Sequence, residues 1–159
     1  MGSNPAARVS APAAGIRVGR GRLLAVAGIT AACAVGTMAL GQKIWTSPPG
    51  AVAPPANLVP FFIALEAAGD VLFGLGVSFV IFGYGLLARA RQPLGLTYAT
   101  YVAIAWLMLS WWPHGNLHRV TADFSQLLYV EYGFHLTLMV AIGVVAVFFL
   151  RAIQTRLEA

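Results

Sequence analysis

Four long apolar runs constrain what this chain can fold into more than any other feature of its sequence. They extend over about residues 23–41, 58–87, 93–112 and 124–150. A helix needs about 20 residues to cross the roughly 30 Å hydrocarbon layer of a bilayer, and each run reaches about that length or more. Hydrophobic residues make up 59% of the 159 residues, charged residues only 9%, and the mean hydropathy is +0.79. The sequence therefore predicts an all-α integral membrane protein, a four-helix transmembrane bundle within residues 23–153.

The two ends of the chain differ in composition from the predicted bundle. Residues 1–22 are rich in Ala, Gly, Pro and Arg and show no apolar period, which predicts a disordered basic tail. A basic segment followed by an apolar run also describes a signal peptide, but the first run is long for one, so we favour an uncleaved span. Residues 154–159 form a short C-terminal end. Cys33 is the only cysteine, which excludes a disulfide within one chain.

The basic residues are distributed unevenly between the two sides of the predicted bundle. Lys43 and Arg119 fall on one side. The other eight fall on the opposite side: Arg8, Arg17, Arg20, Arg22, Arg89, Arg91, Arg151 and Arg156. The positive-inside rule then predicts a multi-pass protein of the plasma membrane with both termini in the cytoplasm. We interpret the formal charge of +5 as a sign of this topology and expect no nucleic-acid partner.

Small residues recur at helical spacing on the first two predicted spans. They are Gly28, Ala32 and Gly36 on the first, and Gly69, Gly76 and Gly83 on the second. Small side chains allow helices in a membrane to approach closely. We expect these faces to pack against other helices, either within the chain or in a membrane-protein partner or a second copy.

Three pairs of ionisable side chains interrupt the apolar sequence, each with a spacing of four residues. The pairs are Glu66 and Asp70, His114 and His118, and Glu131 and His135. On a helix this spacing puts both members of a pair on one face. Counting about 20 residues from the opposite end of each span brings all three pairs to one level, the extracytoplasmic mouth of the bundle. We therefore expect the pairs to converge on one polar site.

A transition-metal ion is the ligand that such a site favours. Carboxylates and imidazoles bind zinc, copper, iron or manganese, and an ionised carboxylate at membrane depth is costly unless it is paired, hydrated or metal-bound. All six residues of the three pairs are candidate metal ligands. The function predicted from them is metal handling or a metal-dependent reaction, in which a glutamate could act as general base.

Each pair also has a structural alternative. Glu131 and His135 could form an ion pair within one helix. Pro113 disturbs or ends the third helix, so the two histidines that follow it could lie in an interfacial loop and ligate nothing. One carboxylate of the first pair could instead bind Arg119.

Two other functions stay open at this point. A haem held by His135 and either His114 or His118 would make the chain an electron-transfer protein. Alternatively, the chain could be a non-catalytic accessory subunit whose small-residue faces dock a larger membrane protein. Transport is less favoured, because the inner, cytoplasmic half of every predicted span carries no ionisable group and so offers no polar path.

Two sequence blocks resemble small uncharacterised bacterial four-span membrane proteins. The blocks are Trp-Trp-Pro-His-Gly-Asn-Leu-His at residues 111–118 and Glu-Tyr-Gly-Phe-His at residues 131–135. The resemblance covers most of the chain from Pro60 to Leu150. It implies the four-span architecture, and it transfers no chemistry, because that family has no assigned function.

Overall fold

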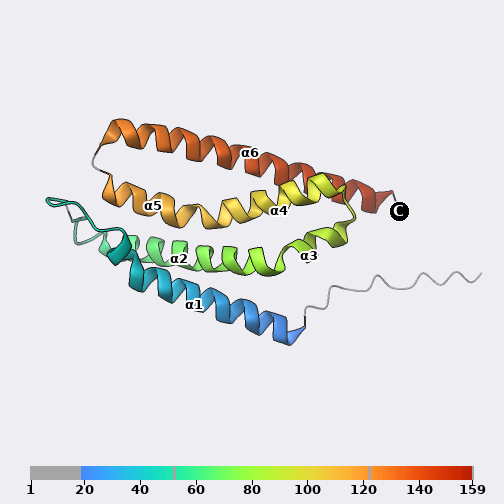
Figure 1. Ribbon diagram of the computed structural model, residues 1–159, viewed down its shortest axis with the longest axis horizontal. Helices are drawn as coiled ribbons and strands as arrows, with labels where there is room; N and C mark the ends of the chain where they lie inside the picture. The colour runs from blue at the N-terminus through green and yellow to red at the C-terminus, as the bar shows by residue number, and fades with distance from the viewer. Residues whose placement is uncertain (1–18, 52, 122, 159) are drawn as a thin grey trace, which may run out of the picture.

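The computed structural model describes residues 19–51, 53–121 and 123–158 (Figure 1). The predicted tail therefore lies outside the described residues except for positions 19–22. In the part described, all regular structure is helical, which confirms the all-α prediction. The helices are α1 (Arg20–Ile44), α2 (Val59–Phe82), α3 (Tyr84–Leu87), the short 3₁₀ helix η1 (Ala88–Ala90), α4 (Leu94–Leu109), α5 (Trp111–Val120) and α6 (Phe124–Leu157).

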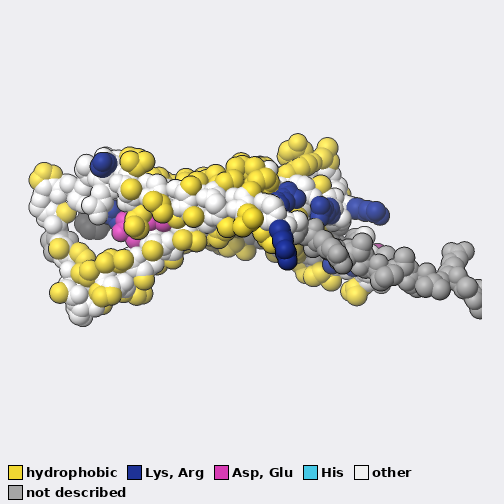
Figure 2. Space-filling model, turned by 90° about the horizontal axis from the view of Figure 1, so that it is seen from below, with side chains coloured by type: hydrophobic (Ala, Val, Ile, Leu, Met, Phe, Trp, Pro, Cys, Tyr) yellow, Lys and Arg dark blue, Asp and Glu magenta, His cyan; other side chains and the backbone are white. Residues whose placement is uncertain are grey.

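Four helical segments are long and apolar enough to cross a membrane, as predicted. They are Arg20–Ile44, Val59–Phe82, Leu94–Val120 and Ser125–Leu157. Large apolar side chains are exposed along them, for example Leu24 at 73% and Met139 at 69%. Hydrophobic side chains cover the middle of the molecule in Figure 2. Such extensive apolar exposure is expected of a surface that faces lipid.

The helices are stacked in Figure 1 in the order α6, α4 with α5, α2 with α3, and α1. α1 packs against α2, α2 packs against α4 and α5, and α4 packs against α6. The start of α1, the η1 turn and the end of α6 share one end of the molecule. Most of the Lys and Arg side chains seen in Figure 2 gather at that end. The connections from α1 to α2 and from α5 to α6 lie at the other end, which is where the three predicted pairs are found.

The contact between α1 and α2 is close because of a glycine. A Cβ atom built on Gly74 would lie 2.5 Å from the backbone oxygen of Thr30. Nearby, the hydroxyls of Thr30 and Ser78 are 3.2 Å apart. The predicted Gly28 face is not part of this contact, since nothing lies within 4 Å of a Cβ built there. The small-residue face predicted on α2 packs closely against α4 at Gly76. A Cβ built on Gly76 would meet the Leu109 side chain of α4 at 2.8 Å.

The third span continues past Pro113. Ser110 alone separates α4 from α5, and its φ of −75° and ψ of −21° are helical. Pro113 lies in the first turn of α5, where its missing N–H group matters least. Ser110 keeps its helical bonds: its N–H donates to the Trp106 oxygen at 3.0 Å, and its own oxygen accepts from the His114 N–H at 3.1 Å. Its hydroxyl also donates to the Trp106 oxygen at 2.6 Å. His114 and His118 therefore lie on a helix, one turn apart, and not in a loop.

Candidate metal centre

Three side chains from two helices meet where α5 faces α6. His114 and His118 project from α5, and Glu131 projects from α6. The two Nε2 atoms are 3.2 Å apart, and Glu131 Oε1 is 2.6 Å from His118 Nε2 and 3.3 Å from His114 Nε2. Among the residues described, these three form the group of histidine and acidic side chains that could hold a metal ion.

The local sequence explains how each element presents its donors. Because α5 continues through Pro113, the histidines at positions 114 and 118 share one face of it. α6 begins at a side-chain cap: the Asp123 carboxylate accepts from the backbone N–H of Ser125 at 2.9 Å and of Gln126 at 3.4 Å. Hydrogen bonds from the Ser125 hydroxyl and from these two N–H groups lower the pKa of Asp123. This cap fixes the start of α6 about two turns before Glu131.

Aromatic packing fixes the ring of His114. It stacks on Phe134 of α6 with a centroid distance of 3.7 Å and an interplanar angle of 6°, and Trp111 meets it edge-on at 6.3 Å. The residue is only 8% exposed. The sequence reasoning missed Phe134, although its place three residues after Glu131 puts it on the same face of a helix.

The size of the donor triangle suits a metal ion. An ion with bonds of about 2.0–2.1 Å in tetrahedral geometry holds its ligand atoms roughly 3.3 Å apart. Two edges of the triangle, 3.2 and 3.3 Å, have this length, and the third, between His118 and Glu131, is shorter at 2.6 Å. Glu131 Oε1 is buried, and despite these short contacts no donor among the described residues is aligned to hydrogen-bond it. The two imidazole nitrogens are within hydrogen-bond distance of each other, whereas the carboxylate oxygen has no hydrogen-bond partner among the described residues.

His135 lies beside this group, but its Nδ1 faces the backbone of its own helix. That nitrogen is 2.8 Å from the backbone oxygen of Glu131, and since a carbonyl only accepts, Nδ1 must carry the proton. The same nitrogen is 3.4 Å from Glu131 Oε2. The ion pair predicted within α6 is thus longer than the contact that Glu131 makes across to α5.

The structure places the two carboxylates of α2 away from the donor group. Glu66 Oε1 accepts from Arg119 Nη2 at 2.8 Å, the alternative that the sequence left open for one member of this pair. Asp70 is 2% exposed, and neither of its carboxylate oxygens has a hydrogen-bond partner among the described residues. The three predicted pairs thus share one end of the molecule, and only two of them supply atoms to the metal-capable group.

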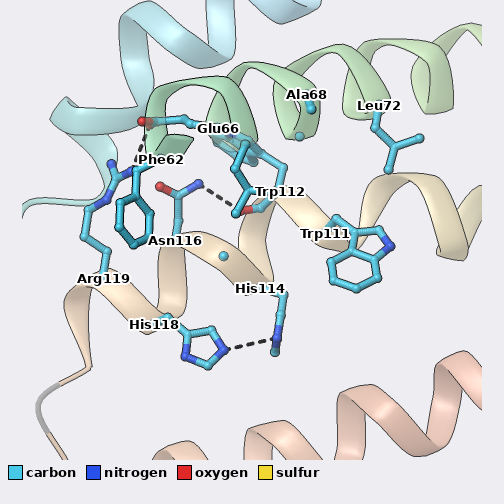
Figure 3. Close-up of a pocket in the computed structure, with 13 residues that line it drawn as sticks. Phe62, Glu66, Ala68, Leu72, Trp111, Trp112, His114, Asn116, His118 and Arg119 are labelled. Atoms are coloured by element: carbon cyan, nitrogen blue, oxygen red, sulfur yellow. Dashed lines mark hydrogen bonds and ion pairs between the residues drawn. The ribbon is translucent and has the colours of Figure 1, made fainter. Parts of the chain in front are cut away.

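A cavity of about 610 Å³ lies next to the donor group, between α2 and α5 (Figure 3). His114 and His118 form part of its wall, and the pair of Glu66 and Arg119 lies at one end. Most of the remaining lining is apolar: Phe62, Leu65, Leu72, Trp111 and Trp112. In Figure 3 both imidazole rings project from α5 away from α2, so the donor atoms lie on the opposite side of α5 from most of this lining.

No family model, curated protein or solved structure matches this chain. The resemblance to small bacterial four-span proteins therefore stays a prediction.

Proposed function

We propose that this protein binds one transition-metal ion through His114, His118 and Glu131. The observation that supports this most directly is the donor triangle itself, in which two imidazole nitrogens and a carboxylate oxygen from separate helices lie within 3.3 Å of one another. Two histidines and one carboxylate bind zinc in several hydrolases and iron(II) in non-haem oxygenases. Zinc and iron(II) are therefore the first ions to test among the candidates.

Three protein ligands leave one or more coordination positions for water or a substrate. An arrangement of this kind is typical of metal sites that carry out a reaction, whereas purely structural zinc sites use four protein ligands. We therefore favour a metal-dependent reaction over metal storage.

We further propose that the site lies at the extracytoplasmic mouth of the bundle in the plasma membrane. Support comes from charge: Lys43 and Arg119 lie at the end that carries the donor group, and six described arginines lie at the other. Positive residues concentrate on the cytoplasmic side of membrane proteins.

Cysteine labelling in intact cells tests this orientation. In a Cys33→Ala background, Ser47→Cys should react with a membrane-impermeant maleimide, and Gln92→Cys should react only after the cells are opened. Labelling of both positions from the same side would contradict the topology.

The haem alternative receives less support. Glu131 lies between the imidazoles that would have to bind the iron, with Oε1 3.3 Å from His114 Nε2 and Oε2 3.4 Å from His135 Nδ1. A haem would need this space. An intense visible absorption band in the purified protein would restore the alternative.

Metal titration of the purified protein tests the proposed site. Wild type should bind about one zinc or iron(II) per chain, and His114→Ala, His118→Ala or Glu131→Ala should weaken binding by more than about 100-fold. Glu66→Gln is the matched control, a carboxylate at the same end that pairs with Arg119. His135→Ala should cost roughly tenfold at most, because that residue contacts the carboxylate and not the proposed ion. Unchanged binding in all three ligand variants would contradict the site.

A further inference from the structure

The cavity between α2 and α5 is a groove with exposed walls. Phe62 and Leu65 of α2 are 46% and 59% exposed, and Trp111 of α5 is 44% exposed. Two glycines, Gly69 and Gly115, belong to its lining, and nothing lies within 4 Å of a Cβ built on either. Because both helices belong to candidate spans, the apolar walls of the groove are accessible to lipid chains.

Two residues of the lining, Asn116 and His114, each have a buried polar atom without a hydrogen-bond partner among the described residues, and the amide of Asn116 is the one considered for a ligand. Asn116 is 7% exposed, and its Nδ2 donates to the backbone oxygen of Trp112 at 2.8 Å. Its Oδ1 is buried and has no hydrogen-bond partner among the described residues. In Figure 3 this oxygen points away from Trp112, toward Phe62 and Arg119. An unsatisfied amide oxygen costs free energy unless a ligand or water donates a hydrogen bond to it.

The same end of the groove carries an ion pair. Arg119 uses Nη2 to bind Glu66, and that pair is partly exposed, with side chains 31% and 40% accessible. A guanidinium has five N–H donors, so one such contact leaves others for an anionic group. The groove thus combines a long apolar wall with a paired guanidinium and a hydrogen-bond acceptor at one end.

We propose that this groove binds one anionic membrane lipid with a hydroxyl-bearing head group. The acyl chain lies along the apolar walls, the phosphate binds Arg119, and a hydroxyl donates to Asn116 Oδ1. The volume of about 610 Å³ is within the range of about 300–1,000 Å³ that is usual for ligand pockets. This proposal is independent of the proposed metal site, whose donor atoms face α6 on the other side of α5.

Native mass spectrometry with phosphatidylglycerol tests the proposal, because that lipid carries both a phosphate and free hydroxyls. Wild type should retain about one phosphatidylglycerol per chain and exchange phosphatidylcholine freely. Gly69→Leu fills the groove and should reduce retention at least about fivefold, as should Arg119→Gln, which removes one basic residue near the head group. Gly143→Leu is the matched control on α6, since its built Cβ also has nothing within 4 Å. Glu66→Gln should keep retention or raise it, because it leaves the whole guanidinium to the phosphate.

A second groove variant, Leu72→Trp, keeps the test valid if Gly69→Leu fails to fold. Equal retention in wild type and a folded groove variant would overturn the proposal. So would a wild-type dimer that Gly69→Leu separates into monomers without loss of lipid, since a second copy would then cover the groove. Zinc bound to the same samples is measured in parallel. A chain that binds zinc without lipid refutes the groove alone, and one that binds lipid without zinc refutes the metal site alone.

Discussion

The contact between α1 and α2 differs in kind from the contact between α5 and α6. At the first, Gly74 brings the two backbones together so closely that an added Cβ would meet Thr30 O at 2.5 Å. At the second, the helices meet through side chains, with two imidazoles from α5 directed at a carboxylate from α6. The α1–α2 contact is close because a side chain is absent, whereas long polar side chains connect α5 and α6.

This difference separates packing from chemistry. In a bilayer, helices associate largely through close van der Waals contact, which a small residue provides and which needs no ligand. Polar side chains between helices are costly there unless they are paired, and the Glu131 Oε1 atom lacks an aligned donor. An ion bound at the α5–α6 contact would therefore add to stability there.

The largest change in stability is expected from a bulky substitution at the contact between α1 and α2. Gly74→Leu inserts a side chain where the Thr30 backbone lies, so α1 must move away from α2. Overpacking of this kind costs about 1–3 kcal/mol or more, and we expect the upper end because the obstacle is backbone. Thermal unfolding in detergent, followed by circular dichroism, measures it. Gly28→Leu is the control on α1, where the built Cβ has open space, and equal destabilisation by both changes would show that the seam is not specific.

The four spans could be predicted because hydropathy and length are properties of one segment at a time. The site depends on which segments become neighbours. The spacing of the histidines put them on one face of a helix, and that held because Pro113 fell in the first turn of α5. In the structure α2 lies on the opposite side of α5 from α6. The spacing of Glu66 and Asp70 within one helix could not predict this order of helices.

Local competition between partners was equally hard to read from the sequence. Arg119 follows His118 directly, and the 100° step per residue of a helix turns it toward α2, where it binds Glu66. Phe134 stacks on His114 through a contact between helices, which a single helical period cannot reveal. The sequence therefore supplied the ionisable residues and their faces, and the helix order decided which of them met.

A smaller but more specific effect is expected at the second seam, when zinc is added. An ion that binds only the folded chain stabilises it by RT ln(1 + [L]/Kd), about 2.7 kcal/mol at a hundredfold excess over Kd. If the ion joins α5 to α6, zinc should raise the thermal midpoint of wild type and of Gly28→Leu, and leave Glu131→Ala and His118→Ala unchanged. Magnesium should have no effect on any of them, because it prefers six oxygen ligands. A zinc effect of equal size in Glu131→Ala would mean that the ion binds elsewhere, and the α5–α6 seam would then be held, like the first, by packing alone.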